Sequence, residues 1–162
     1  MSELAWRDLG GSGRPFVLVH GYTGSSDDFV HVIEPLTELR RIILVDLPGH
    51  GDSPRSERYS LDAMTAAVAG FLETVVGEPC DLLGHSMGGR VVLPIAIDGS
   101  GLLGSLVLMD TWADTPDDEA RSEEMEALLA LPDADAVAAW QRRSPEPPTA
   151  ETDLIGARWG QN

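Results

Sequence analysis

A serine flanked by glycines stands between a short apolar stretch and a helix-like stretch near the middle of the chain. Residues 80–83 are mostly apolar and strand-sized, and they run without a loop into residues 84–89, Gly-His-Ser-Met-Gly-Gly. The apolar pattern of residues 90–97 then indicates a helix. Strand, tight turn and helix in this order form the setting in which G-x-S-x-G marks a nucleophilic serine. The sequence therefore predicts that Ser86 lies on a sharp turn at the end of a buried strand.

The first 111 residues alternate between strand-like and helix-like segments. Strands are expected at residues 4–9, 16–19, 42–45, 80–83 and 106–109, and helices at residues 27–39, 61–76 and 90–97. Asp27 or Asp28 is expected to cap the first helix and Ser60 the second. The first helix is expected to have an inner face made of Phe29, Val32, Ile33 and Leu36. The apolar positions of the second are Leu61, Met64, Val68, Phe71, Leu72 and Val75. This alternation predicts an α/β fold, a mostly parallel sheet with helices on both faces.

The character of the sequence changes after Asp110. No convincing strand follows, and two amphipathic helices are predicted at residues 117–131 and 133–143, before a proline-rich break at residues 144–148. We therefore expect two parts, an α/β core at residues 1–111 and a helical lid at residues 112–162. The lid is expected to be incomplete, with the chain truncated inside it.

The glycines around Ser86 make room for a tight turn. A serine on a strained turn projects its hydroxyl above the sheet, and bulky neighbours would collide with the adjoining elements. Gly84, Gly88 and Gly89 remove those side chains. The helix that begins near Met87 directs free N–H groups to the same place, where they would stabilise an oxyanion.

Three motifs in order resemble the α/β-hydrolase family over residues 16–111. They are His20-Gly21-Tyr22 after the first long strand, residues 46–53 (Asp-Leu-Pro-Gly-His-Gly-Asp-Ser), and the turn around Ser86. The resemblance implies that the backbone N–H groups of Tyr22 and Met87 form an oxyanion hole. It also places His20 and Gly21 in a loop at the substrate site, with His20 packing and hydrogen-bonding rather than acting as a base. Neither a metal nor an organic cofactor is implied.

Arg90 directly follows the glycines after Ser86. Together with the other motifs it is similar to the branch of the family that eliminates pyruvate in the menaquinone pathway, where an arginine at this position helps to hold a carboxylated substrate. The same combination occurs in esterases and C–C hydrolases of the family. A surface ion pair in the first turn of a helix is the plainer interpretation of Arg90.

A serine nucleophile needs a base, and the base needs an orienting acid. In this family the chain order is serine, acid, histidine. All four histidines, at positions 20, 31, 50 and 85, precede Ser86. Asp110, at the end of the strand after the serine's helix, is a candidate acid, although more often the acid lies on the next strand. In the leading hypothesis an Asp and a His from a missing C-terminal segment activate Ser86. Trp112 in the lid is expected to contribute an apolar pocket wall.

The net charge of the chain limits the kinds of partner that it can bind. The net charge is −16, which argues against nucleic acid and anionic membranes, since both require a basic surface. One cysteine and an N-terminus without an apolar leader favour a cytoplasmic protein. The leading hypothesis is a serine hydrolase of a small carboxylic ester or a related acyl or C–C substrate. The alternatives are a lyase of the menaquinone type and a non-catalytic remnant that binds a small molecule or a partner.

Overall fold

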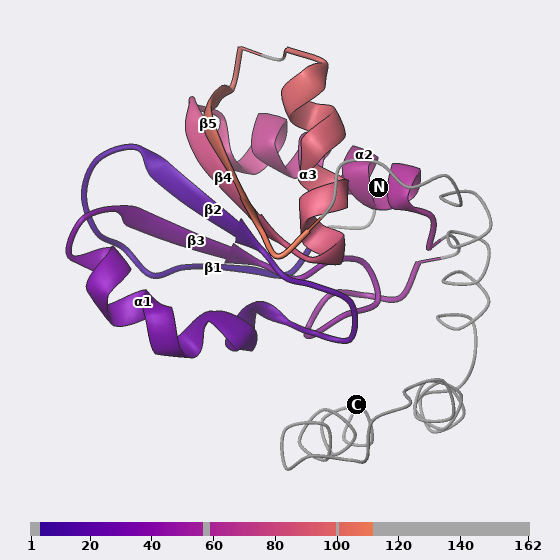
Figure 1. Cartoon of the computed structure of the whole chain (residues 1–162), viewed down its shortest axis with the longest axis horizontal. Coiled ribbons are helices and arrows are strands. Elements are labelled where there is room, and N and C mark those ends of the chain that lie inside the picture. The colour runs from indigo at the N-terminus through magenta and orange to yellow at the C-terminus, as the bar shows by residue number, and fades with distance from the viewer. Residues whose placement is uncertain (1–3, 57–58, 100, 112–162) are drawn as a thin grey trace.

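A five-stranded sheet forms the centre of the computed structural model, which describes residues 4–56, 59–99 and 101–111 (Figure 1). The strands lie in the order β1-β3-β2-β4-β5. Their bounds are Trp6–Asp8 for β1, Pro15–Val19 for β2, Arg41–Val45 for β3, Cys80–His85 for β4 and Leu103–Met109 for β5. β1 is antiparallel to β3, and every other neighbouring pair is parallel. The prediction of a mostly parallel sheet is confirmed.

Helices cover both faces of this sheet. The segments η1 (Ser26–Phe29) and α1 (Val30–Thr37) lie on one face, and α2 (Leu61–Phe71), η2 (Leu72–Val76) and α3 (Met87–Ile97) lie on the other (Figure 1). Side chains alternate along the strands, so each face has its own core. Beside α1 the buried set is Phe16, Leu18, Phe29, Ile42 and Leu44, whereas beside α2 and α3 it includes Val17, Val19, Ile43, Val45, Met64, Val68, Val91 and Val92. The predicted two-sided covering is confirmed.

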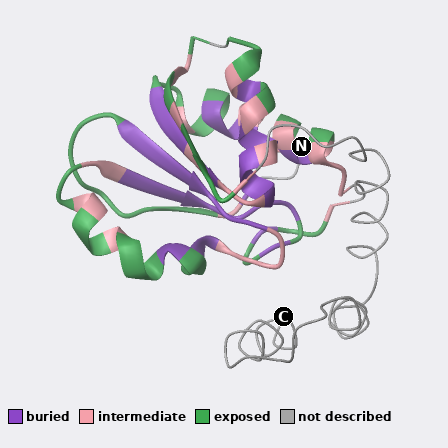
Figure 2. Cartoon of the chain, viewed as in Figure 1, coloured by how far each residue is buried: buried purple, intermediate pink, exposed green. Residues whose placement is uncertain are grey.

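The register of the parallel strands brings their carboxyl ends to one edge. Val19 of β2 is paired with Val45 of β3 on one side and with Gly84 of β4 on the other. β2 and β3 are buried along almost their whole length, as Figure 2 shows, as expected of parallel strands with helices on both faces. The segments that follow these strands, at His20, Asp46 and Ser86, therefore start side by side, where ligands bind in sheets of this kind.

Two expectations about the helices are wrong in detail. The cap of the first helical segment is Ser25, in a capping box with Asp28, and not Asp27 or Asp28 itself. Val32, expected on an inner face, is 46% exposed, and Val75, an apolar position of the second predicted helix, is 45% exposed. Each valine follows or lies within a turn of different pitch, a 3-10 turn before α1 and a π turn after α2. Such turns rotate the following side chains away from the face that a regular α-helix would give them. The Ser60 cap is confirmed, because its hydroxyl accepts from the Ala63 N–H.

A buried carboxylate, that of Asp81, lies at the opposite edge of the sheet, where the parallel strands begin. Asp81 is 2% exposed and pairs with Arg40 at 2.8 Å and Arg14 at 3.4 Å. Burial alone would raise the pKa of Asp81, but the hydrogen bond from Ser105 and the two guanidinium groups hold it below its usual value. The Asp81 carboxylate therefore stays ionised, and its charge is balanced by the guanidinium groups of Arg14 and Arg40.

The predicted helices at residues 117–131 and 133–143, and with them the lid, lie outside the described residues. Within the described ranges no helix is long and apolar enough to cross a membrane.

Candidate active site

Ser86 occupies a strained turn between β4 and α3. Its backbone angles are φ 49° and ψ −116°, in a region that residues with a side chain rarely adopt and that clusters at functional sites. Its own N–H donates to the Met109 carbonyl at 2.9 Å, which ties the turn to the end of β5. The side chain is half-buried at the carboxyl edge of the sheet. This is the backbone arrangement expected of a nucleophile elbow.

The backbone carbonyl oxygen of Ser86 accepts two hydrogen bonds. It accepts from the Gly89 N–H at 3.0 Å and from the Thr111 hydroxyl at 2.6 Å. Thr111 was not singled out in the sequence, since a threonine after a strand carries no signal of its own. These contacts fix the peptide that joins Ser86 to Met87, and thereby the direction of the Met87 N–H.

Close packing explains the glycines around the turn. A Cβ at Gly84 would lie 2.6 Å from the Gly88 carbonyl oxygen and from the Gly89 Cα. A Cβ at Gly88 would lie 2.4 Å from the His20 carbonyl oxygen and 2.5 Å from that of Val19. Real Cβ atoms do not approach backbone so closely. The first turn of α3 is therefore seated directly on the end of β2.

The loop after β2 adjoins Ser86. A Cβ on Gly21 would lie 3.1 Å from the Ser86 Cβ and 3.1 Å from Nδ1 of His85, so the backbone of the predicted oxyanion loop passes beside the serine. Tyr22 follows and is half-buried. Met87 is the first residue of α3, where the N–H groups have no partner inside the helix. The two predicted oxyanion donors thus belong to the segments that adjoin Ser86.

His20 is wholly buried. Its Nε2 accepts from the Leu47 N–H at 3.0 Å, and its Nδ1 lies 2.8 Å from the Gly21 carbonyl oxygen. Burial lowers the pKa of His20 below its usual value, with the hydrogen bond to Gly21 acting in the opposite direction. Because the ring is inside the protein, any contact of His20 with a substrate would come from its backbone.

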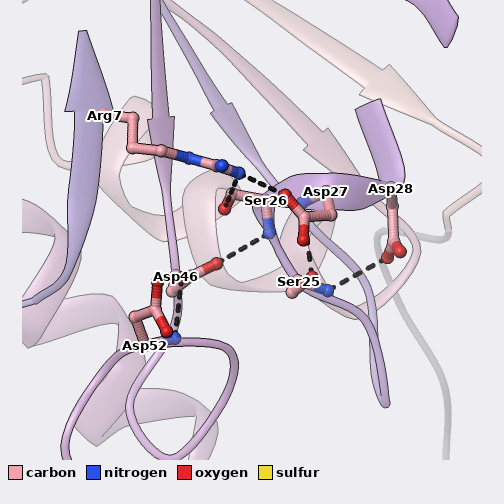
Figure 3. A network of polar contacts seen from close by, with 7 residues as sticks. All are labelled: Arg7, Ser25, Ser26, Asp27, Asp28, Asp46 and Asp52. Carbon is pink, nitrogen blue, oxygen red and sulfur yellow. Dashed lines mark hydrogen bonds and ion pairs between the residues drawn. The ribbon is translucent and has the colours of Figure 1, made fainter. Parts of the chain in front are cut away.

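Asp46 joins the loop that follows β2 to the loop that follows β3. One carboxylate oxygen accepts from the Ser26 N–H at 2.7 Å and the other from the Asp52 N–H at 3.0 Å, as Figure 3 shows. Arg7 of β1 reaches the same region and binds the Ser26 hydroxyl and Asp27. The buried carboxylate therefore holds residues 20–29 and 46–53 together. The sequence indicated the motif but gave no sign of this cross-link.

Asp110, Arg90 and Trp112 complete the predicted set. Asp110 follows β5 directly, is exposed and has a left-handed φ of 47°. Because His85 is paired with Met109, Asp110 continues β5 beside Ser86. Arg90 is half-buried, four residues after Ser86 in α3, which is about one helical turn. Trp112 lies outside the described residues.

No imidazole in the described ranges hydrogen-bonds to the Ser86 hydroxyl. His31 is exposed on α1, His20 and His50 are buried, and His85 abuts Gly21. Within the same ranges, His, Cys, Asp and Glu side chains form no group of three that could hold a metal ion. Among the described residues the site therefore consists of the Ser86 turn, the adjoining Gly21 backbone and the first residue of α3.

Comparisons with known proteins agree with the fold described above. A family model described as the alpha/beta hydrolase fold matches residues 14–143. Over 95 residues the chain is 41% identical to the dihydrolipoyllysine-residue acetyltransferase component of the acetoin cleaving system of Pseudomonas putida, covering 57% of this chain and 26% of that protein. Over 125 residues it is 31% identical to esterase YbfF of Escherichia coli K12, covering 77% of this chain and 49% of that protein.

Among solved structures, MenH from S. aureus superposes with a TM-score of 0.73 at 23% identity, over 97% of this chain and 65% of that chain. This likeness concerns the fold alone. The chain spans 26% to 49% of the length of the two curated relatives named above.

Proposed function

This chain belongs to the α/β-hydrolase family, and from that membership we propose that it carries the nucleophile and the oxyanion-binding groups of a serine-dependent esterase. The observation that supports this most directly is the strained backbone of Ser86, with φ 49°, beside the Gly21 loop. Strain of this kind persists only where the surrounding structure enforces it. Here the neighbouring strand, Gly89 and Thr111 all bond to the serine backbone.

In the proposed reaction the Ser86 hydroxyl oxygen attacks the carbonyl carbon of a small carboxylic ester. The bond to the alcohol breaks, the alcohol leaves with a proton, and water then releases the acid from the acyl-enzyme. The N–H groups of Tyr22 and Met87 donate to the oxyanion that forms on the carbonyl oxygen. Preorganised backbone donors need no rearrangement at that moment, because both segments are already fixed by the sheet.

The proposed reaction also needs an orienting acid, a base and a pocket wall. We assign the orienting acid to Asp110, which extends β5 beside Ser86, and an apolar pocket wall to Trp112. In this family the base follows the acid along the chain. Because all four histidines of residues 1–162 precede Ser86, none of them is assigned that role.

A fluorophosphonate probe tests the nucleophile. An oxyanion hole and substrate binding alone leave a serine hydrolase with roughly 10³- to 10⁴-fold acceleration when a triad member is removed. We therefore expect Ser86 to be labelled at least about a hundredfold faster than any other serine of the chain, as measured by peptide mass spectrometry over time. Ser86→Ala should abolish the fast label, whereas Ser12→Ala, which removes an exposed turn hydroxyl, should leave it unchanged. Uniform slow labelling of all serines would contradict the proposal and favour a non-catalytic remnant.

Arg90 favours a second candidate, a lyase or hydrolase of a carboxylate-bearing substrate, because this guanidinium group is attached one helical turn from Ser86. We expect Arg90→Gln to change p-nitrophenol release from p-nitrophenyl acetate and from p-nitrophenyl hemisuccinate by the same small factor. A loss confined to the hemisuccinate, about 10- to 100-fold for one charge-assisted hydrogen bond, would instead support carboxylate recognition and the second candidate.

A further inference from the structure

The contacts of His20 fix its tautomer. The Leu47 backbone N–H can only donate, so Nε2 of His20, 3.0 Å away, must carry a lone pair. The one ring proton of the neutral imidazole then lies on Nδ1, which donates to the Gly21 carbonyl oxygen at 2.8 Å. Burial, which lowers the pKa of His20, keeps the ring in this neutral form.

The Gly21 carbonyl belongs to the same peptide as the Tyr22 N–H. Peptide bonds are planar, and the described chain has no cis peptide, so these two groups point in opposite directions. A second donor, the Gly24 N–H at 3.2 Å, also binds this carbonyl. With the carbonyl held toward the His20 ring in the protein interior, the Tyr22 N–H is turned to the other side of the loop. The same loop passes Ser86 at Gly21.

The loop after β3 makes several contacts that hold the His20 ring in place. It supplies the Leu47 N–H, and its His50 ring packs on His20 with centroids 5.1 Å apart. Nδ1 of His50 lies 3.0 Å from the Pro48 carbonyl oxygen, and Asp46 ties the loop to Ser26. These contacts leave the His20 ring one position and one tautomer.

We propose that His20 is a positioning residue for the oxyanion donor: the Leu47 N–H sets its tautomer, and its Nδ1–H sets the Gly21–Tyr22 peptide so that the Tyr22 N–H faces the oxyanion at Ser86. The inference rests on the proposed function, because it concerns the oxyanion hole of that reaction. It gives residues 46–53 an effect on the reaction through the His20 imidazole.

Two substitutions separate positioning from simple structural support. The amide nitrogen of asparagine takes the place of Nδ1, so His20→Asn keeps a donor for the Gly21 carbonyl and loses the acceptor for Leu47. The amide of glutamine takes the place of Nε2, so His20→Gln keeps an acceptor for the Leu47 N–H and loses the donor to Gly21. Each variant gives up one of the two contacts, and we expect similar losses of Tm.

The rate of Ser86 labelling by the fluorophosphonate should distinguish them. We expect His20→Gln to slow labelling about 100-fold, the cost of displacing a catalytic group by about 1 Å, and His20→Asn to recover most of that loss. His31→Gln, at an exposed position of α1, is the background control and should label at the wild-type rate. Equal slowing in both His20 variants would overturn the inference in favour of structural support.

Nuclear magnetic resonance tests the same point without any reaction. Imidazole ¹⁵N shifts should identify His20 as the Nδ1–H tautomer, and the Tyr22 amide resonance should move in His20→Gln and stay near its wild-type position in His20→Asn. An Nε2–H tautomer, or a Tyr22 amide that moves equally in both variants, would overturn the inference. If Ser86 fails to react with the probe in the wild-type chain, the proposed function fails, while the tautomer and the Tyr22 amide still decide this inference.

Discussion

Gly88→Ala should lower the free energy of unfolding by about 3 kcal/mol, the upper part of the usual range for overpacking. The added Cβ would lie 2.4 Å from the His20 carbonyl oxygen and 2.5 Å from the Val19 carbonyl oxygen. Both atoms are backbone at the end of a buried strand, so neither can rotate away as a side chain would. The variant can relieve the clash only by lifting the first turn of α3 off β2. Urea denaturation of the full chain measures the loss as a lower midpoint.

Gly70→Ala is the matched control. Gly70 lies inside α2, and a Cβ there meets nothing within 4 Å, so the same substitution should raise the free energy of unfolding by about 0.5–1 kcal/mol through helix propensity. A Gly88→Ala variant within about 1 kcal/mol of the wild type would mean that α3 is not seated on β2 as described. The displaced helix should also slow the labelling of Ser86, because Ser86 is the residue that joins β4 to α3.

Local sequence patterns were enough to predict the architecture. Buried parallel strands are continuous apolar runs, and residues 16–19 and 42–45 have that composition without ambiguity. Serine before the apolar pattern of the second helix identified its cap, because Ser60 has a local physical role. The turn at Ser86 could also be predicted, because the order of strand, glycine-flanked serine and helix is a local pattern, although the close packing of Gly88 is on Val19 and His20, which lie far from it along the chain.

Features that depend on tertiary contacts could not be predicted. The pairing of Leu47 with His20 joins residues 27 positions apart, and the Thr111 clamp on Ser86 joins residues 25 apart. Neither leaves a periodic or compositional trace in a single sequence. The irregular turns beside α1 and α2 were missed for a related reason, because sequence periodicity assumes the regular pitch of 3.6 residues per turn. The predicted roles of Ser86, Tyr22, Met87 and Asp110 stay predictions, and the labelling experiments test those of Ser86 and Tyr22.

Acidification should destabilise the chain through His50. The ring is buried, and burial, with the neighbouring His20, lowers the pKa of His50 to about 4, against the weaker opposing effects of the Pro48 carbonyl, Asp46 and Asp28. In the unfolded chain the pKa of histidine is about 6.5. Between these two values the unfolded state binds a proton that the folded state does not, so stability falls as the pH falls.

The expected loss is roughly 3 kcal/mol between pH 6.5 and pH 4, at 1.36 kcal/mol for each pKa unit. It should be absent above pH 6.5 and complete near pH 4. Urea denaturation at a series of pH values measures it. His50→Asn is the informative variant, because its amide nitrogen can still donate to the Pro48 carbonyl but does not titrate.

His50→Asn should therefore flatten the pH dependence by about that amount, and His31→Asn, which removes an exposed imidazole, should keep the wild-type slope. The buried Nε2 of His50 has no hydrogen-bond partner among the described residues, so a proton added there would have no acceptor in the fold. Burying such a cation without a partner is the physical reason for the low pKa. An unchanged slope in His50→Asn would show that this nitrogen reaches water or an acceptor in the folded chain, and that His50 does not limit stability in acid.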